Sequence, residues 1–98
     1  MAIQVDIQNS QFGIPFSGAY FRVATAIVSR QRGEPKHIVM IDISGYATRP
    51  EHDDIREVDF RRYHAPLSEV EAQVGDTFLA KCYAWLMQQP DMQGSVGV

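Results

Sequence analysis

Alternating apolar and polar residues predict four β-strands in this chain. Residues 3–7, 20–29, 37–46 and 56–63 each show the two-residue period of a strand that buries one face. The polar segment 30–35 carries the Gly and Pro that are typical of a hairpin loop. We therefore expect the second and third strands to form an antiparallel hairpin.

The same alternation assigns faces to the two longest strands. In the second strand, one face is predicted to carry Phe21, Val23, Thr25 and Ile27. The third strand begins with apolar residues on both faces, which places it in the middle of the sheet.

The fourth predicted strand has one strongly charged face. Val58 and Phe60 alternate with charged residues, namely Glu57, Asp59 and Arg61. A charged face suits an edge strand that must resist unwanted pairing. Pro66 is expected to end this segment.

A helical period replaces the strand period near the C-terminus. It predicts a helix that Asp76 or Thr77 introduces and that ends at Gln89, before Pro90. We expect its apolar stripe to be core, packed on the central hairpin. The stripe comprises Phe78, Leu79, Cys82, Tyr83, Trp85 and Leu86.

The segments that flank this helix are less regular. Ser68 and Glu71 have the spacing of a capping box, so a short helical turn with Ser68 as its N-cap is expected. Residues 91–98 are rich in Gly, and we expect this flexible tail to fray unless a partner holds it.

These elements predict an α+β fold: an antiparallel sheet of about four strands with one C-terminal helix packed on a face. The chain has 98 residues, of which 45% are hydrophobic. That length and composition suit one domain spanning 1–98 with a single core, and they argue against disorder.

Charge and cysteine content narrow the function classes. The net charge is −3 and the isoelectric point is about 5.5. The sequence pattern does not indicate a basic face, so nucleic acid is not an expected partner. Cys82 is the only cysteine, which excludes an intrachain disulfide. We expect no signal peptide, no membrane span and no membrane partner.

Candidate chemistry is sparse. His52, Asp53 and Asp54 are adjacent on a predicted loop, where they converge poorly on one ion, so no metal site and no cofactor are expected. Cys82 would need a histidine base such as His64 to act as a nucleophile, but its place on the apolar stripe favours a core residue. The run from Arg61 to His64 suits a charged edge strand better than a phosphate site.

A segment near the N-terminus has an unusual density of apolar residues for a loop. Phe12, Ile14, Pro15 and Phe16 lie among turn formers. Two interpretations remain open: these side chains fold back onto the sheet, or they form an exposed patch that binds a partner.

Two segments resemble a family of small proteins encoded among the virion and tail genes of tailed bacteriophages and prophages. The first, residues 13–23, reads GIPFSGAYFRV and enters a strand through Ala-Tyr and a basic-aliphatic pair. The second, residues 80–95, reads AKCYAWLMQQPDMQGS and joins an alanine-tyrosine helix to a proline and an acidic-apolar pair. The chain departs from the family pattern at Met87, where lysine is more frequent, and at Gly97, where aspartate is more frequent.

The resemblance implies a non-enzymatic structural or assembly role in the tail, baseplate or neck of a particle. The implied partners are other virion proteins and further copies of the chain, in the virion or in the bacterial cytoplasm during assembly. Strand addition at a sheet edge and docking of Phe12, Ile14 or Phe16 are the expected contacts. The alternative is a small cytoplasmic protein-binding module, or a phage accessory protein that modulates a host protein.

Overall fold

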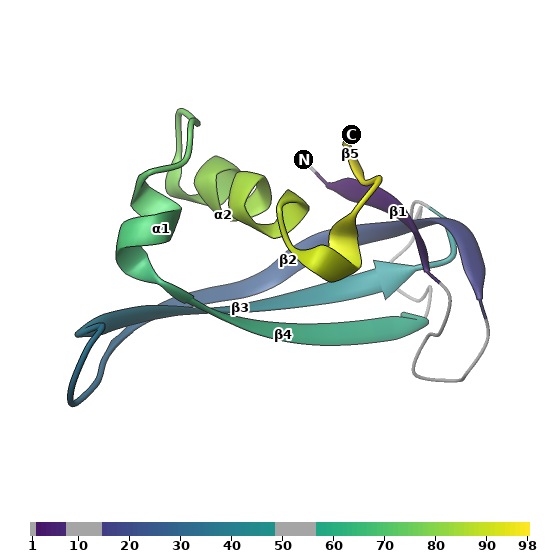
Figure 1. The fold of residues 1–98 in the computed structure, drawn as a ribbon. Coiled ribbons are helices and arrows are strands. Elements are labelled where there is room, and N and C mark those ends of the chain that lie inside the picture. The colour runs from purple at the N-terminus through teal and green to yellow at the C-terminus, as the bar shows by residue number, and fades with distance from the viewer. Residues whose placement is uncertain (1, 8–14, 49–56) are drawn as a thin grey trace.

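The computed structural model describes residues 2–7, 15–48 and 57–98, which form an α+β fold (Figure 1). The elements, in chain order, are β1 (Ile3–Ile7), β2 (Phe16–Arg30), β3 (His37–Tyr46), β4 (Asp59–Pro66), α1 (Leu67–Glu71), α2 (Phe78–Met87), a 3-10 turn (Pro90–Met92) and β5 (Val96–Gly97). The expected four strands and one helix are therefore joined by a short fifth strand and a second, short helix.

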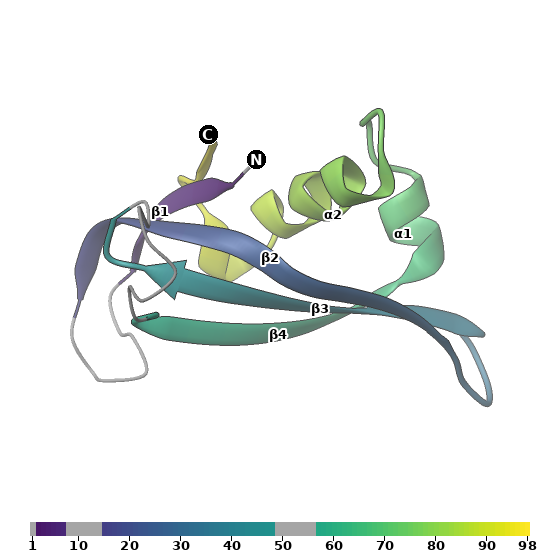
Figure 2. The same ribbon diagram turned by 180° about the vertical axis from the view of Figure 1, so that it is seen from behind.

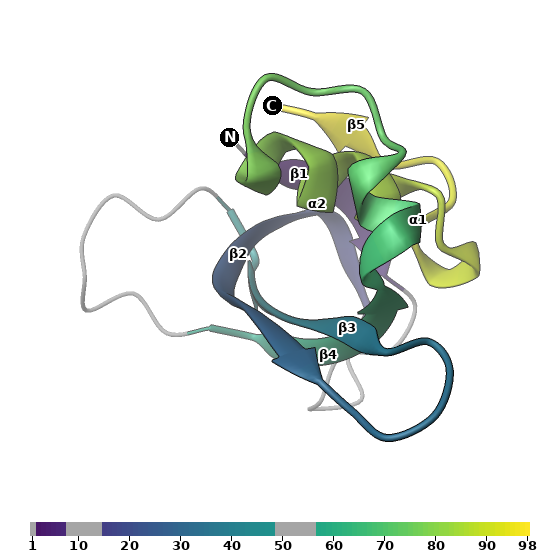
Figure 3. The ribbon, with the colours of Figure 1, turned by 90° about the vertical axis from the view of Figure 1, so that its left-hand side faces the viewer.

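The strands form one antiparallel sheet in the order β4-β3-β2-β1-β5. β3 lies between β2 and β4, as its two apolar faces predict, and β4 is an edge. Helices α1 and α2 lie on one face of the sheet (Figures 1 and 2). Seen from the end, the sheet curls around the helical layer (Figure 3).

A bulge in β2 changes which residues reach the core. The register with β3 shifts between Val23 and Thr25, so Val23 lies opposite Ile43 while Ala26 lies opposite Ile41. Because one extra residue reverses the alternation, Ala26 packs on the core and Ile27 turns to the other face. The prediction that Ile27 shares a face with Phe21 and Val23 is wrong for this reason.

Tyr83 forms a hydrogen bond at the β2 bulge. The backbone N–H of Val23 donates a 2.8 Å hydrogen bond to the Tyr83 hydroxyl oxygen. Burial raises the pKa of the Tyr83 phenol, so the hydroxyl stays neutral. Helix α2 is thereby tied to the strand on which it packs.

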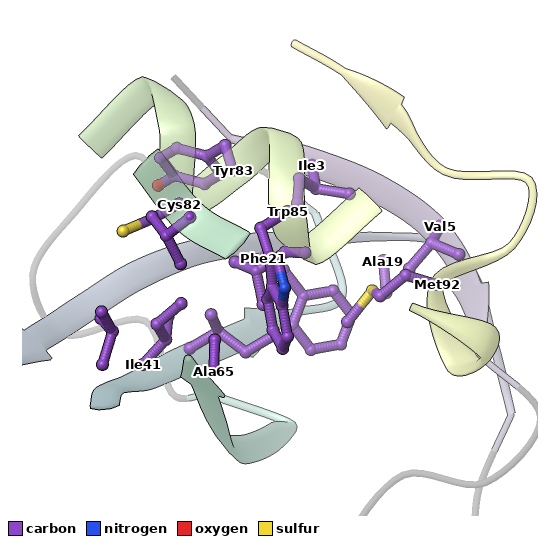
Figure 4. Packing of buried hydrophobic residues seen from close by; sticks show 14 of the residues in the cluster. Ile3, Val5, Ala19, Phe21, Ile41, Ala65, Cys82, Tyr83, Trp85 and Met92 are labelled. Atoms are coloured by element: carbon purple, nitrogen blue, oxygen red, sulfur yellow. The ribbon is translucent and has the colours of Figure 1, made fainter. Parts of the chain in front are cut away.

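Phe21 lies at the centre of the core, among residues from the sheet and from α2 (Figure 4). Opposite it on β3 is Gly45, where an added Cβ would lie 2.8 Å from Cζ and 2.9 Å from Cδ1 of the Phe21 ring. The aromatic ring therefore occupies the space that a side chain at position 45 would need. The Arg61 guanidinium lies 5.3 Å from the centre of the same ring.

The faces of β4 are the reverse of those predicted. Asp59, Arg61, Tyr63 and Ala65 face the helices, whereas Phe60 is exposed on the opposite face. Ion pairs make the inward charges tolerable. Arg61 Nε lies 3.0 Å from Asp59 Oδ2, and its NH1 atom lies 3.2 Å from Asp91 Oδ2.

The C-terminal residues are held to the body of the protein, whereas the sequence predicted a fraying tail. Met92 is fully buried, and Tyr63 donates a 2.6 Å hydrogen bond to Asp91 Oδ2. Strand β5 pairs with β1, and Ala2 and Val98 exchange two backbone hydrogen bonds of 2.9 Å. The partner that orders this segment is the chain's own N-terminal strand.

The two helices begin differently. Thr77 caps α2 by accepting a hydrogen bond from the N–H of Ala80, as predicted. Helix α1 begins one residue before Ser68, with Pro66 at the N-cap position and no side-chain cap. The predicted capping box is therefore not formed.

Candidate protein-binding surface

The face of β2, β3 and β4 that points away from the helices is not covered by any element in the described part of the chain (Figures 1 and 2). We call it the outer face. Cross-strand pairing arranges its residues in rows. Three of these rows are Arg22–Ser44–Phe60, Thr25–Asp42–Arg62 and Ile27–Met40–His64.

Apolar side chains are exposed at two places on the outer face. Ile27 is 46% exposed and Phe60 is 41% exposed, with the half-buried Met40 between their strands. Exposed apolar groups on a face that also carries charged groups are typical of a surface that binds another protein.

Two arginines on the outer face lie beside aromatic rings. The Arg22 guanidinium lies 5.2 Å from the centre of the Tyr46 ring, and that of Arg62 lies 6.0 Å from the Phe60 ring. Arg62 also binds Asp42 through both carboxylate oxygens, at 2.7 and 3.2 Å. Hydrogen bonds from Arg62 lower the pKa of Asp42 despite its burial.

The Arg62–Asp42 pair should make stability depend on pH. Because the folded pKa of Asp42 lies below its unfolded value, the pair stabilises the native state above about pH 4 and loses this effect as the pH falls through the folded pKa. The difference in unfolding free energy between the wild type and Asp42→Asn should be largest near neutral pH and shrink in acid. Urea unfolding across this range measures it, and a difference independent of pH would contradict the assignment.

The predicted partner-binding segment lies mostly outside the described residues. Phe12 and Ile14 fall there. Pro15 is exposed immediately before β2, and Phe16 begins β2 opposite Ile7. Whether this segment binds a partner therefore stays a prediction.

The predicted helix stripe divides into buried and exposed parts. Cys82, Tyr83, Trp85 and Leu86 are buried in the core. Phe78 and Leu79 are 39% and 45% exposed, which differs from the prediction that they are core. They occupy the first turn of α2, where the chain arrives from the exposed loop 72–77.

Cys82 and His64 do not form a catalytic pair. Cys82 belongs to α2 and is buried in the core, whereas His64 is exposed on the outer face of β4, on the other side of the sheet. Burial raises the pKa of the Cys82 thiol, which disfavours the nucleophilic thiolate.

The Cys82 thiol should consequently react slowly in the native protein. With 5,5′-dithiobis(2-nitrobenzoate) at mildly alkaline pH, we expect the native thiol to react about a thousandfold or more slowly than the thiol in urea-unfolded chain, because reaction requires opening of the core. A native rate close to the unfolded rate would contradict its burial.

Other chemistry receives no support from the described residues. His52, Asp53 and Asp54 lie outside them. Within residues 2–7, 15–48 and 57–98, no three His, Cys, Asp or Glu side chains are grouped as metal ligands would be. None of the helices in these ranges has the length and apolar character to cross a membrane. Comparisons with protein-family models, curated proteins and solved structures find no match to this chain.

Sequence reasoning missed the outer-face residues for two reasons. The bulge in β2 that turns Ile27 outward has no signal in the alternation around Ala24. The sequence does contain a signal for which residues of β4 face inward, because Tyr63 and Ala65 share a face with Arg61 and are apolar enough to pack inward. Reading the strand through to Pro66 would have placed Phe60 outside.

Proposed function

We propose that this chain is a non-enzymatic protein-binding subunit: a structural or assembly component of a tailed-phage or prophage particle, in the tail, baseplate or neck. The observation that carries the proposal is the outer face, where exposed Ile27 and Phe60 share one side of the sheet with Arg22 and Arg62, and Arg62 lies beside Phe60. Covering the apolar groups on a partner would remove their surface from water. The arginines would set the orientation of the partner through charge.

The placement of the two segments that resemble phage proteins supports the proposal that the chain is a component of a phage or prophage particle. Residues 15–23 run into β2, and residues 80–95 comprise most of α2 and the turn that follows. They meet at the hydrogen bond between Val23 and Tyr83. Two segments far apart in the sequence thus form one packed unit, as expected if the shared residues maintain a shared fold.

The edges of the sheet offer a second kind of contact. β4 is an outer strand of eight residues, whereas the other outer strand, β5, has only two residues and offers little length for pairing. Strand addition along β4 would extend the sheet and place a partner beside Phe60. Contact through the edge and contact through the outer face are therefore compatible.

Quantitative mass spectrometry of purified particles tests this function. In particles from a phage or prophage that carries the gene, we expect the chain at a fixed copy number relative to the tail proteins, and we expect Phe60→Asp to be lost from them. Absence of the wild-type chain from particles, with its recovery in a complex with a host protein, would favour a host-directed accessory protein instead.

A further inference from the structure

Exposed carboxylates gather in one segment on the helical side of the molecule, and exposed basic groups lie on the outer face. Segment 69–79, on the helical side, contains three carboxylates, Glu69, Glu71 and Asp76, and no basic residue. All three are exposed. On the outer face, Arg22, Arg62 and His64 are exposed. The charge of Arg62 is offset by its ion pair with Asp42, whereas Arg22 lies over the ring of Tyr46.

The acidic segment also exposes apolar side chains. Val74 is 93% exposed in the loop between the helices, and Phe78 and Leu79 follow at the start of α2. We call this part of the surface, residues 69–79, the acidic knob. The loop projects away from the sheet (Figures 1 and 2).

The acidic knob and the outer face are complementary. Each exposes apolar side chains that would be buried on contact, and the charges beside them are of opposite sign. They lie on opposite sides of the sheet, so one molecule cannot bring its own two surfaces together (Figure 3). A second copy can supply the missing surface at each side.

We propose that the chain associates head to tail with further copies of itself, the acidic knob of one copy docking on the outer face of the next. Val74, Phe78 and Leu79 contact Ile27 and Phe60 of the neighbour, and the carboxylates of the knob face Arg22 and Arg62. Because the two surfaces differ, the contact is heterologous and produces a ring or a filament rather than a closed two-fold dimer. This inference rests on the proposed assembly role and names the partner of the outer face.

Sedimentation velocity of the wild type and of two interface variants tests the contact. The wild type should form species larger than a dimer as its concentration rises, and added salt should weaken them because screening reduces the charge attraction. Phe60→Asp changes only the outer face, and Val74→Asn/Leu79→Asn changes only the knob. Each should raise the dissociation constant about tenfold or more.

Mixing the two variants distinguishes a head-to-tail contact from other associations. The Phe60→Asp chain keeps its knob and the Val74→Asn/Leu79→Asn chain keeps its outer face, so the mixture should form one-to-one dimers that do not extend. Val96→Asp, which places the same charge on an exposed valine of β5, should associate as the wild type does. Circular dichroism of each variant establishes that it is folded.

Three outcomes would overturn the inference: a wild type that stays monomeric at every concentration, a Phe60→Asp variant that associates like the wild type, or a mixture of the two variants that stays monomeric. A monomeric wild type whose Phe60→Asp variant is nevertheless lost from particles would overturn self-association alone. The proposed function would stand, with another virion protein as the partner of the outer face.

Discussion

Replacing Trp85 by alanine should lower the free energy of unfolding by about 3–5 kcal/mol. Trp85 is 7% exposed, and its ring meets Tyr63 edge to face at a centroid distance of 6.2 Å. A domain of this size has about 5–15 kcal/mol of stability in total. The variant should therefore lose a large share of its stability. Urea unfolding followed by circular dichroism measures the loss, because the chain has no other tryptophan for fluorescence.

Phe78→Ala is the matched control, since it truncates an aromatic side chain in the same helix. Phe78 is partly exposed in the first turn of α2, so we expect a loss of only about 1 kcal/mol. Equal losses at the two positions would mean that the helix does not present one buried face to the sheet.

The second large effect is expected in the C-terminal segment. Met92, the last residue of the 3-10 turn, is fully buried, so Met92→Ala should cost about 2–5 kcal/mol. Its neighbour Gln93 is exposed, and Gln93→Ala should change stability by no more than about 0.5 kcal/mol. Urea unfolding of the two variants compares them. If Met92→Ala were as stable as the wild type, the tail would be frayed, as the sequence predicted.

Short sequence patterns predicted an element correctly where its apolar residues repeat with one unbroken period. The third strand was expected at 37–46 and is found there, because its alternation is unbroken. Thr77 marked the start of α2, which ends at Met87, two residues before the predicted Gln89 and shortly ahead of Pro90. In each case the determining physics lies within a few residues of the chain, so a sequence shows it.

Long-range interactions decided the features that sequence reasoning missed. Arg61 faces inward because Asp91, thirty residues away, supplies a carboxylate beside the core. Residues 96–98 are ordered because the N-terminal strand offers a free edge. Neither partner is visible from the sequence around the residue that it holds.

The candidate surface was hidden from the sequence for the same reason. The alternation in each strand predicted Ile27 on the same face as Phe21, and Phe60 on the face opposite Arg61. Only the observed registers with β3 show that both residues lie on the uncovered side of the sheet. The sequence instead predicted that the N-terminal segment around Phe12 binds a partner, and this remains a prediction. A contact face is a property of the assembled sheet, which no single strand reveals.

The proposal that the outer face performs a phage assembly function is tested most directly by complementation of a phage from which this gene has been deleted. Infectious titre is compared after supply of the wild type, Phe60→Asp or Val96→Asp, with the folding of each verified. We predict that Val96→Asp restores the wild-type titre and that Phe60→Asp does not. A Phe60→Asp chain that restores the full titre would contradict the role assigned to this face.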